Sequence, residues 1–98
     1  MEAVLSAAEQ ADAAGLGIFA LPVSEQQAPG YSRVVVDPVD LQTIRTRLRD
    51  RLYAETDEVL ADVLRMYDNC ELFNTQPASR VFAEEAQRQR AAVLAAVL

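Results

Sequence analysis

The sequence contains no histidine, no tryptophan and no lysine, and Cys70 is its single cysteine. Histidine is the commonest general base and a frequent zinc ligand, so its absence argues against catalysis and against a metal site. One cysteine excludes an internal disulfide and fits a reducing compartment. Gly15 and Gly17 lack the third glycine and the preceding strand of a dinucleotide-binding motif. We therefore expect a protein that is not an enzyme and that carries no metal and no cofactor.

The charge balance is acidic, with a net charge of −6 and arginine as the only basic residue type. An acidic surface argues against binding to a nucleic-acid backbone, because that affinity comes mainly from clustered Lys and Arg. It would suit a basic peptide, although a charge that only aids solubility is the simpler explanation. No apolar run approaches membrane-spanning length, and the first residues lack the basic region of a signal peptide. We expect no direct binding to nucleic acid or membrane.

The length and composition predict one small helical domain that spans residues 1–98. Alanine, leucine, glutamate, glutamine and arginine favour helix, and strand-forming residues cluster only at Val34–Val36. Seventeen alanines account for much of the 51% hydrophobic content, so the core must rest on few large side chains.

Four segments carry apolar residues at spacings of three and four, which predicts four amphipathic helices. They run from about Ala3 to Ala14, from Asp40 to Leu52, from about Thr56 to Asn74, and from about Ser79 onward. Asp40 is a plausible N-cap of the second helix, and Asp37 before Pro38 is the alternative. One long and two short connections describe a four-helix bundle. The inward-facing residues that we expect are Val4, Leu5, Ala8, Ala11, Leu41, Ile44, Leu48, Leu52, Val59, Val63, Met66, Tyr67, Cys70, Phe82, Ala86, Val93 and Val97.

The connection from Gly15 to Val39 is unusually long, and loops of this length in small domains are usually functional or disordered. Its apolar residues argue against disorder and predict a loop that is anchored on the bundle. A short strand at Ser32–Val36 is the alternative, but no second strand pattern exists to pair with it. The expected anchors are Phe19, Leu21, Val23, Tyr31 and the three valines of Val34–Val36.

Short motifs follow one another between residues 19 and 74, and their spacing requires no insertion or deletion from Val23 to Asn74. They are Phe19-Ala20-Leu21-Pro22-Val23, Pro29-Gly30-Tyr31, Pro38-Val39-Asp40-Leu41 with Thr43-Ile44, Tyr53, Asp62-Val63, Asn69-Cys70 and Phe73-Asn74. Their order and spacing resemble the bromodomain family, helical modules that bind acetylated lysine. The resemblance covers nearly the whole chain and implies an all-α fold, a four-helix bundle of bromodomain type with a long loop between helices 1 and 2.

The resemblance also implies a pocket for the neutral acetyl-lysine side chain. Asn74 would donate its NH₂ group to the acetyl oxygen, and Tyr31 would donate its hydroxyl to an ordered water. We expect no anion in this pocket, so a charged lysine would lose its hydration without compensation. At the rim, Val81 is favoured over Arg80. The expected acetyl-lysine-binding residues are Asn74, Tyr31, Val23, Phe19, Pro22, Ala28, Cys70, Phe73 and Val81.

Each of these residues also has a simpler structural interpretation. Asn74 is a common type of helix C-cap, and Tyr31 is a possible loop anchor. Cys70 is expected to be unreactive, because the nearby Asp68 and Glu71 would raise the pKa of its thiol. The pair Glu84–Glu85 is expected to form a solvated first turn of the last helix.

The sequence departs from the family pattern at several positions. Gly17 stands where many members have a bulky aromatic, Ile18 stands where many have proline, and Phe73 replaces the usual tyrosine. Gly17 favours a smaller hydrophobic shelf beside the pocket, and Phe73 removes a hydroxyl from the rim. The alternative is therefore a divergent bromodomain fold that no longer binds acetyl-lysine and acts as a protein-docking scaffold.

The resemblance further implies partners and a location. We expect acetylated lysine peptides, with histone tails as the first candidates, and a nuclear location. We also expect a monomeric domain that works within a larger protein or complex.

Overall fold

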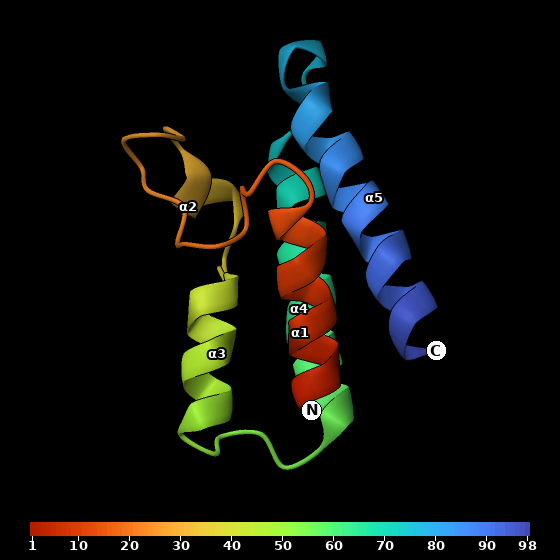
Figure 1. Ribbon diagram of the computed structural model, residues 1–98. Coiled ribbons are helices and arrows are strands. Elements are labelled where there is room, and N and C mark those ends of the chain that lie inside the picture. Colours follow the sequence, from red (N-terminus) through yellow and green to blue (C-terminus); the bar gives the residue numbers. More distant parts are fainter.

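The computed structural model describes all 98 residues and contains helices but no strands (Figure 1). This confirms the predicted all-α bundle with a long loop between its first two main helices. A short helix lies inside that loop, and a 3-10 turn joins the last two main helices. The elements are α1 Glu2–Ala13, α2 Tyr31–Val34, α3 Leu41–Arg49, α4 Thr56–Phe73, the 3-10 turn Pro77–Ser79 and α5 Arg80–Val97.

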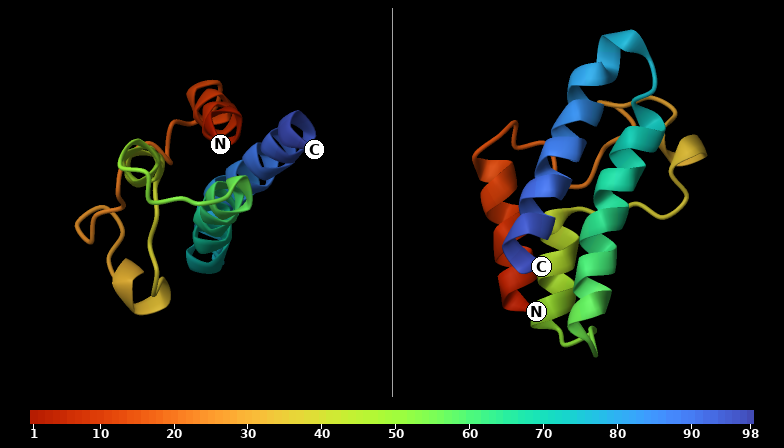
Figure 2. Two further views of the ribbon diagram at one scale, coloured as in Figure 1. Left: turned by 90° about the horizontal axis from the view of Figure 1, so that it is seen from below. Right: turned by 90° about the vertical axis from the view of Figure 1, so that its right-hand side faces the viewer.

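The helices α1 and α4 form the middle of the bundle, and each packs against both α3 and α5 (Figure 2). The helices α3 and α5 lie on opposite sides of this central pair. The long loop and the connection from α4 to α5 lie at one end, while both termini lie toward the other end (Figure 1). None of the helices is long and apolar enough to cross a membrane.

The inner face of α1 matches the predicted stripe, because Val4, Leu5, Ala8 and Ala11 are all buried. Two of these four residues are alanines, whose small side chains let neighbouring helices approach closely. The same core contains Ile44 from α3 together with residues of α4 and α5. These are Val59, Val63, Met66, Tyr67 and Cys70 from α4, and Ala86 and Val93 from α5.

Asp40, and not the alternative Asp37, is the N-cap of α3. Its carboxylate accepts a hydrogen bond of 3.0 Å from the backbone N–H of Thr43. The start of α4 is fixed by Glu58, which accepts 2.8 Å hydrogen bonds from the backbone N–H groups of Ala54 and Glu55. Both arrangements satisfy donors that the first turn of a helix leaves unpaired.

The helix α3 ends at Arg49, earlier than predicted, and Leu52 is 67% exposed instead of buried. Arg51 adopts a left-handed conformation with φ 59°. The N–H groups of Arg51 and Leu52 donate to the carbonyls of Leu48 and Arg47, at 3.1 and 2.9 Å. This is a Schellman ending, which usually carries glycine where Arg51 stands, so the composition gave no stop signal.

The long loop contains one turn of helix, α2, where a strand was the alternative. Gly30 precedes it with φ 84°, and Glu25 accepts hydrogen bonds from the N–H groups of Gly30 and Ser32 at 2.9 and 2.7 Å. Of the three expected valine anchors only Val35 is buried. The expectation was wrong for Val34, the last residue of α2, which is 41% exposed, and for Val36, two residues beyond α2, which is 93% exposed.

Candidate functional site

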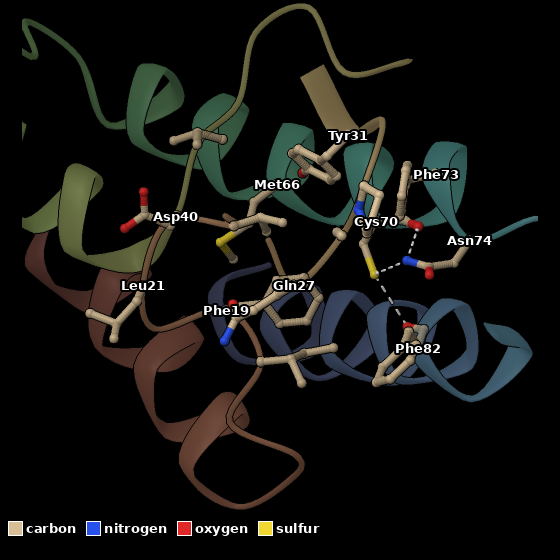
Figure 3. A pocket seen from close by; sticks show the side chains of 15 residues that line it. Phe19, Leu21, Gln27, Tyr31, Asp40, Met66, Cys70, Phe73, Asn74 and Phe82 are labelled. Atoms are coloured by element: carbon tan, nitrogen blue, oxygen red, sulfur yellow. Dashed lines mark hydrogen bonds between the residues drawn. The ribbon is translucent and has the colours of Figure 1, made fainter. Parts of the chain in front are cut away.

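A cavity of about 340 Å³ lies at the loop end of the bundle (Figure 3). The long loop forms one wall, the C-terminal half of α4 forms another, and the start of α5 closes the third side. The lining is mainly apolar, with 11 hydrophobic residues among 15. The full set is Ile18, Phe19, Leu21, Val23, Gln27, Ala28, Pro29, Tyr31, Val39, Asp40, Met66, Cys70, Phe73, Asn74 and Phe82.

Most of the expected site residues are brought together here: Phe19, Val23, Ala28, Tyr31, Cys70, Phe73 and Asn74 line the cavity. Pro22 and Val81 do not line it, which corrects the expectation for both. Val81 is 54% exposed, and Phe82 takes the lining position on α5. Neighbouring residues on a helix point about 100° apart, so only one of the two faces the cavity. Arg80 also lies outside the lining.

Some lining residues were not expected from the sequence. Met66 lies one turn before Cys70 on α4, so its helical spacing was an available signal. Gln27 carried no signal, because it lies in a loop with no periodic pattern. Its side chain makes no hydrogen bond within the protein, and only its backbone N–H is paired, with Ser24.

Asn74 sits at the end of α4 as its C-cap. Its side-chain NH₂ donates to the carbonyl of Cys70 at 2.8 Å and lies 3.5 Å from the Cys70 sulfur (Figure 3). A carboxamide has two N–H donors. The carbonyl of Cys70 takes one of them, and the other meets only the Cys70 sulfur, a weak acceptor that a ligand oxygen would replace. The capping interpretation and the ligand-donor interpretation are therefore compatible.

Cys70 joins two walls of the cavity, because its thiol donates to the carbonyl of Phe82 at 3.3 Å. The pKa of the Cys70 thiol is raised to about 11, mainly by burial and to a smaller degree by Glu71 and Glu85, while the Asn74 hydrogen bond opposes the shift. The expected direction of the shift was right, but burial is its main cause. Asp68 instead pairs with Arg90 at 2.6 Å.

Tyr31 is buried, and its ring meets Phe73 edge to face at a centroid distance of 5.0 Å. Its hydroxyl has no hydrogen-bond partner within the protein. Burial raises the pKa of Tyr31, and Cys70 adds to the effect. The phenol therefore stays protonated at neutral pH and keeps its donor.

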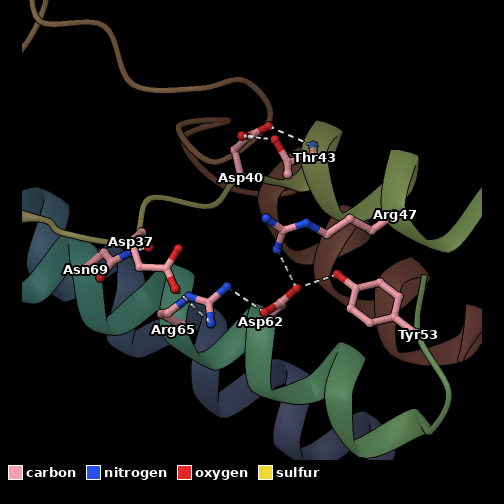
Figure 4. A network of polar contacts seen from close by, with 8 residues as sticks. All are labelled: Asp37, Asp40, Thr43, Arg47, Tyr53, Asp62, Arg65 and Asn69. Carbon is pink, nitrogen blue, oxygen red and sulfur yellow. Dashed lines mark hydrogen bonds and ion pairs between the residues drawn. The ribbon is translucent and has the colours of Figure 1, made fainter. Parts of the chain in front are cut away.

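Asp40 is the one charged residue in the lining, contrary to the expected pocket without an anion. Its two carboxylate oxygens are engaged by Thr43, one by the backbone N–H at 3.0 Å and the other by the hydroxyl at 2.6 Å (Figure 4). The carboxylate is thus committed to the first turn of α3.

Polar contacts hold the end of the loop against α4 (Figure 4). The side chain of Asn69 donates to the backbone carbonyl of Asp37 at 3.0 Å, and Arg65 pairs with Asp37 at 3.5 Å. Arg65 also pairs with the buried Asp62 at 2.6 Å. Asp62 further accepts from Arg47 at 2.9 Å and from the Tyr53 hydroxyl. We call these residues the loop-end network: Asp37, Arg47, Tyr53, Asp62, Arg65 and Asn69.

A helical bundle whose apolar cavity presents a few placed hydrogen-bond donors is typical of a binding module. A sequence model of the bromodomain family matches residues 1–88, so this chain belongs to the bromodomain family. Bromodomains are reader modules for acetyl-lysine and not enzymes.

Curated relatives are chromatin and transcription proteins. The chain is 40% identical over 73 residues to mouse bromodomain adjacent to zinc finger domain protein 2A. It is 38% identical over 71 residues to Drosophila melanogaster transcription initiation factor TFIID subunit 1. These matches cover 74% and 66% of this chain but only 4% and 3% of the relatives.

Solved bromodomain structures share the fold. A Leishmania donovani bromodomain complexed with bromosporine matches with a TM-score of 0.83 and 33% identity, over 96% of this chain and 79% of that one. A Trypanosoma brucei bromodomain, also in complex with bromosporine, matches with a TM-score of 0.84 and 32% identity, over 95% and 77% of the two chains.

Proposed function

We propose that the cavity binds the acetylated side chain of a lysine and that Asn74 donates its second N–H to the acetyl oxygen. The observation that carries this proposal is the position of Asn74, whose carboxamide lies at an apolar cavity and whose second N–H is engaged only by the weakly accepting Cys70 sulfur. The unpaired Tyr31 hydroxyl supports a second contact through an ordered water.

The lining favours the acetylated form of lysine over the charged form. An ammonium in this cavity loses its hydration, and the one carboxylate present, Asp40, is already engaged by Thr43. A neutral amide loses less hydration energy than an ammonium, and its oxygen regains a hydrogen bond from Asn74. Because the site holds one side chain, we expect affinity no tighter than about 1 μM. Stronger binding in a cell would need a second module or a multiply acetylated partner.

The proposed partner is a basic histone tail bound by a monomeric module within a larger nuclear protein. The net charge of −6 supports a basic peptide, because opposite charge favours encounter. The chromatin and transcription proteins among the relatives support the nuclear location.

The alternative of a docking scaffold without ligand binding is less well supported. It predicts a cavity filled by Arg80 or by a collapsed loop. Instead, about 340 Å³ is open beside Asn74, and Arg80 lies outside the lining.

Calorimetric titration with acetylated and unmodified histone-tail peptides tests the proposal. Asn74→Ala should weaken binding of the acetylated peptide at least about tenfold, the equivalent of one lost hydrogen bond in a desolvated site. Gln27→Ala is the matched control, because it removes a second carboxamide from the same cavity, and it should change affinity by less than about threefold. Equal binding of both peptide forms, or full affinity in Asn74→Ala, would sink the proposal. A larger loss in Gln27→Ala would move the donor role to Gln27.

A further inference from the structure

A buried polar cluster lies outside the cavity, where α1, α5 and the start of the long loop meet. We call it the loop-start cluster; it consists of Asp12 from α1 and Glu85, Arg88 and Gln89 from α5. Gln89 is fully buried and Asp12 and Glu85 are nearly so, whereas Arg88 keeps 46% of its side chain exposed. Charged and amide groups in such a place are costly unless they are paired. Their contacts therefore show what the cluster holds in position.

Asp12 organises the backbone that leaves α1. Its carbonyl accepts 3.1 Å hydrogen bonds from the N–H groups of Gly15 and Gly17. Its carboxylate then accepts from the N–H of Phe19, with both oxygens at 3.3 Å. Asp12 thus holds the backbone N–H groups of Gly15, Gly17 and Phe19, and Phe19 is part of the cavity wall.

Gln89 fixes Asp12 in turn. Its side-chain nitrogen donates to Asp12 Oδ1 at 3.0 Å and to Glu85 Oε2 at 2.9 Å. Both N–H donors are therefore used on carboxylates, while the buried Gln89 Oε1 has no partner. An unpaired buried acceptor is unfavourable. The protein tolerates it here because the opposite amide orientation would set an oxygen against two carboxylates.

Glu85 and Arg88 extend the cluster to the loop. Glu85 Oε2 accepts from the N–H of Leu16 at 2.9 Å, and Arg88 pairs with Glu85 at 2.8 Å. Arg88 also donates to the carbonyl of Ala11 at 2.8 Å. The start of α5 therefore holds both the last turn of α1 and the first loop residues.

Phe19 connects this cluster to the cavity. Its N–H is held by Asp12, and its carbonyl accepts from the N–H of Leu41 at 2.9 Å. Its ring packs edge to face on Tyr67, with centroids 5.2 Å apart, and lines the cavity (Figure 3). The backbone of Phe19 is thus hydrogen-bonded to α1 through its N–H and to the start of α3 through its carbonyl.

We infer that Asp12 and Gln89 are positioning residues for the acetyl-lysine site, acting through Phe19, although neither lines the cavity. The inference rests on the proposed function. It makes affinity depend on a polar contact between α1 and α5 that no ligand touches. If Asp12 and Gln89 only stabilised the bundle, replacing them would weaken binding no more than replacing a core residue with the same loss of stability.

Gln89→Met tests this, because methionine keeps the size of glutamine and removes both donated hydrogen bonds. The matched control is Val93→Ala, one turn further along α5, which removes packing from a fully buried core residue that holds no loop atom by a hydrogen bond. Three measurements are made on the whole chain: the denaturant midpoint, calorimetric affinity for an acetylated histone-tail peptide, and amide hydrogen exchange of Phe19 by NMR. Affinity is measured without denaturant, under conditions in which both variants are fully folded.

We expect Gln89→Met to weaken peptide binding about tenfold and to accelerate hydrogen exchange of the Phe19 amide. Val93→Ala should change neither quantity, even where its denaturant midpoint falls as far. If both variants lose affinity equally, or if Gln89→Met changes neither affinity nor Phe19 exchange, the positioning role is excluded. Should Gln89→Met fail to fold, Asp12→Asn gives the same comparison, with one acceptor kept for Phe19 and therefore a smaller effect. If the unaltered protein binds no acetylated peptide, the proposed function fails, and Phe19 exchange in the two variants still decides the positioning.

Discussion

The two ends of the long loop are held by different kinds of contact. At its start, the nearly buried carboxylates of Asp12 and Glu85 accept from backbone N–H groups of the loop and from the fully buried Gln89. Only Arg88, which also pairs with Glu85, reaches water there and keeps 46% of its side chain exposed. At its end, Asp62 is buried, but its partners Arg47 and Arg65 keep 34% and 33% of their side chains exposed.

This difference predicts different responses to perturbation. Asp12 and Gln89 have no water to replace a lost partner, so their contact at the loop start should fail abruptly when one of the two is removed. The loop-end network shares one carboxylate among several partly hydrated donors, so it should weaken gradually and respond to salt. Both ends position cavity residues, with Phe19 beside the first and Asp40 beside the second.

The largest effect is expected for Asp62→Ala at the loop end. The substitution leaves Arg47, Arg65 and Tyr53 without their shared acceptor. We expect it to lower the free energy of unfolding by about 2–3 kcal/mol, less than for a fully buried ion pair because the arginines regain water. Denaturant unfolding measures the change. Asp50→Ala, which breaks an exposed pair with Arg49, is the control and should cost about 0.5 kcal/mol or less. Equal losses in the two variants would remove Asp62 as an anchor.

A smaller loss is expected for Gly15→Ala at the loop start. A Cβ atom at this position would lie 2.0 Å from Glu85 Oε2 and 2.3 Å from Arg88 Nη2, so the paired side chains must move apart. We expect a loss of about 1–2 kcal/mol in the free energy of unfolding.

The double variant Gly15→Ala/Glu85→Ala provides the control for this effect. Without the Glu85 carboxylate much of the collision disappears, and alanine is then favoured over glycine by the lower entropy of the unfolded chain, by about 0.4–1 kcal/mol. If Gly15→Ala costs the same in both backgrounds, the collision with Glu85 is not its cause.

The acid sensitivity of the fold depends on Glu85, whose contribution is present at neutral pH and is lost only in acid. The hydrogen bond from Arg88 is the main cause that lowers the pKa of Glu85 from 4.5 to about 2, with further contributions from Leu16 and Gln89. Because the folded-state pKa lies below the unfolded one, Glu85 stabilises the fold above pH 4.5 and loses this contribution as pH falls toward 2. Unfolding curves of Glu85→Gln should therefore vary less with pH across this window. Parallel curves for both proteins would contradict this assignment.

The helices themselves were largely predictable because their signals are local. The stripe of α1 and the cap at Asp40 need only neighbouring residues, and both were predicted correctly. The end of α3 was missed because Arg51 adopts a conformation that sequence patterns assign to glycine. Phe82 was predicted to face the core and Val81 the cavity rim, but Phe82 is the residue of α5 that lines the cavity.

The loop-start cluster could not be predicted, because its contacts join residues far apart in the sequence. Glu85 was expected in a solvated first turn, yet it is buried and binds the N–H of Leu16, 69 positions away. A glutamate near a helix start fits both outcomes, and only the packing of α1 against α5 decides between them. The motifs that carry the family resemblance lie between residues 19 and 74, so Asp12 and Gln89 fall outside them.

The placement of the termini has a practical consequence. Both ends of the chain lie toward the opposite pole of the bundle from the cavity (Figure 1). A tag, a surface tether or a fused partner attached at either end therefore leaves the mouth of the cavity facing the solution. Two copies joined tail to tail would point their cavities outward, an arrangement suited to spanning two marks on one substrate.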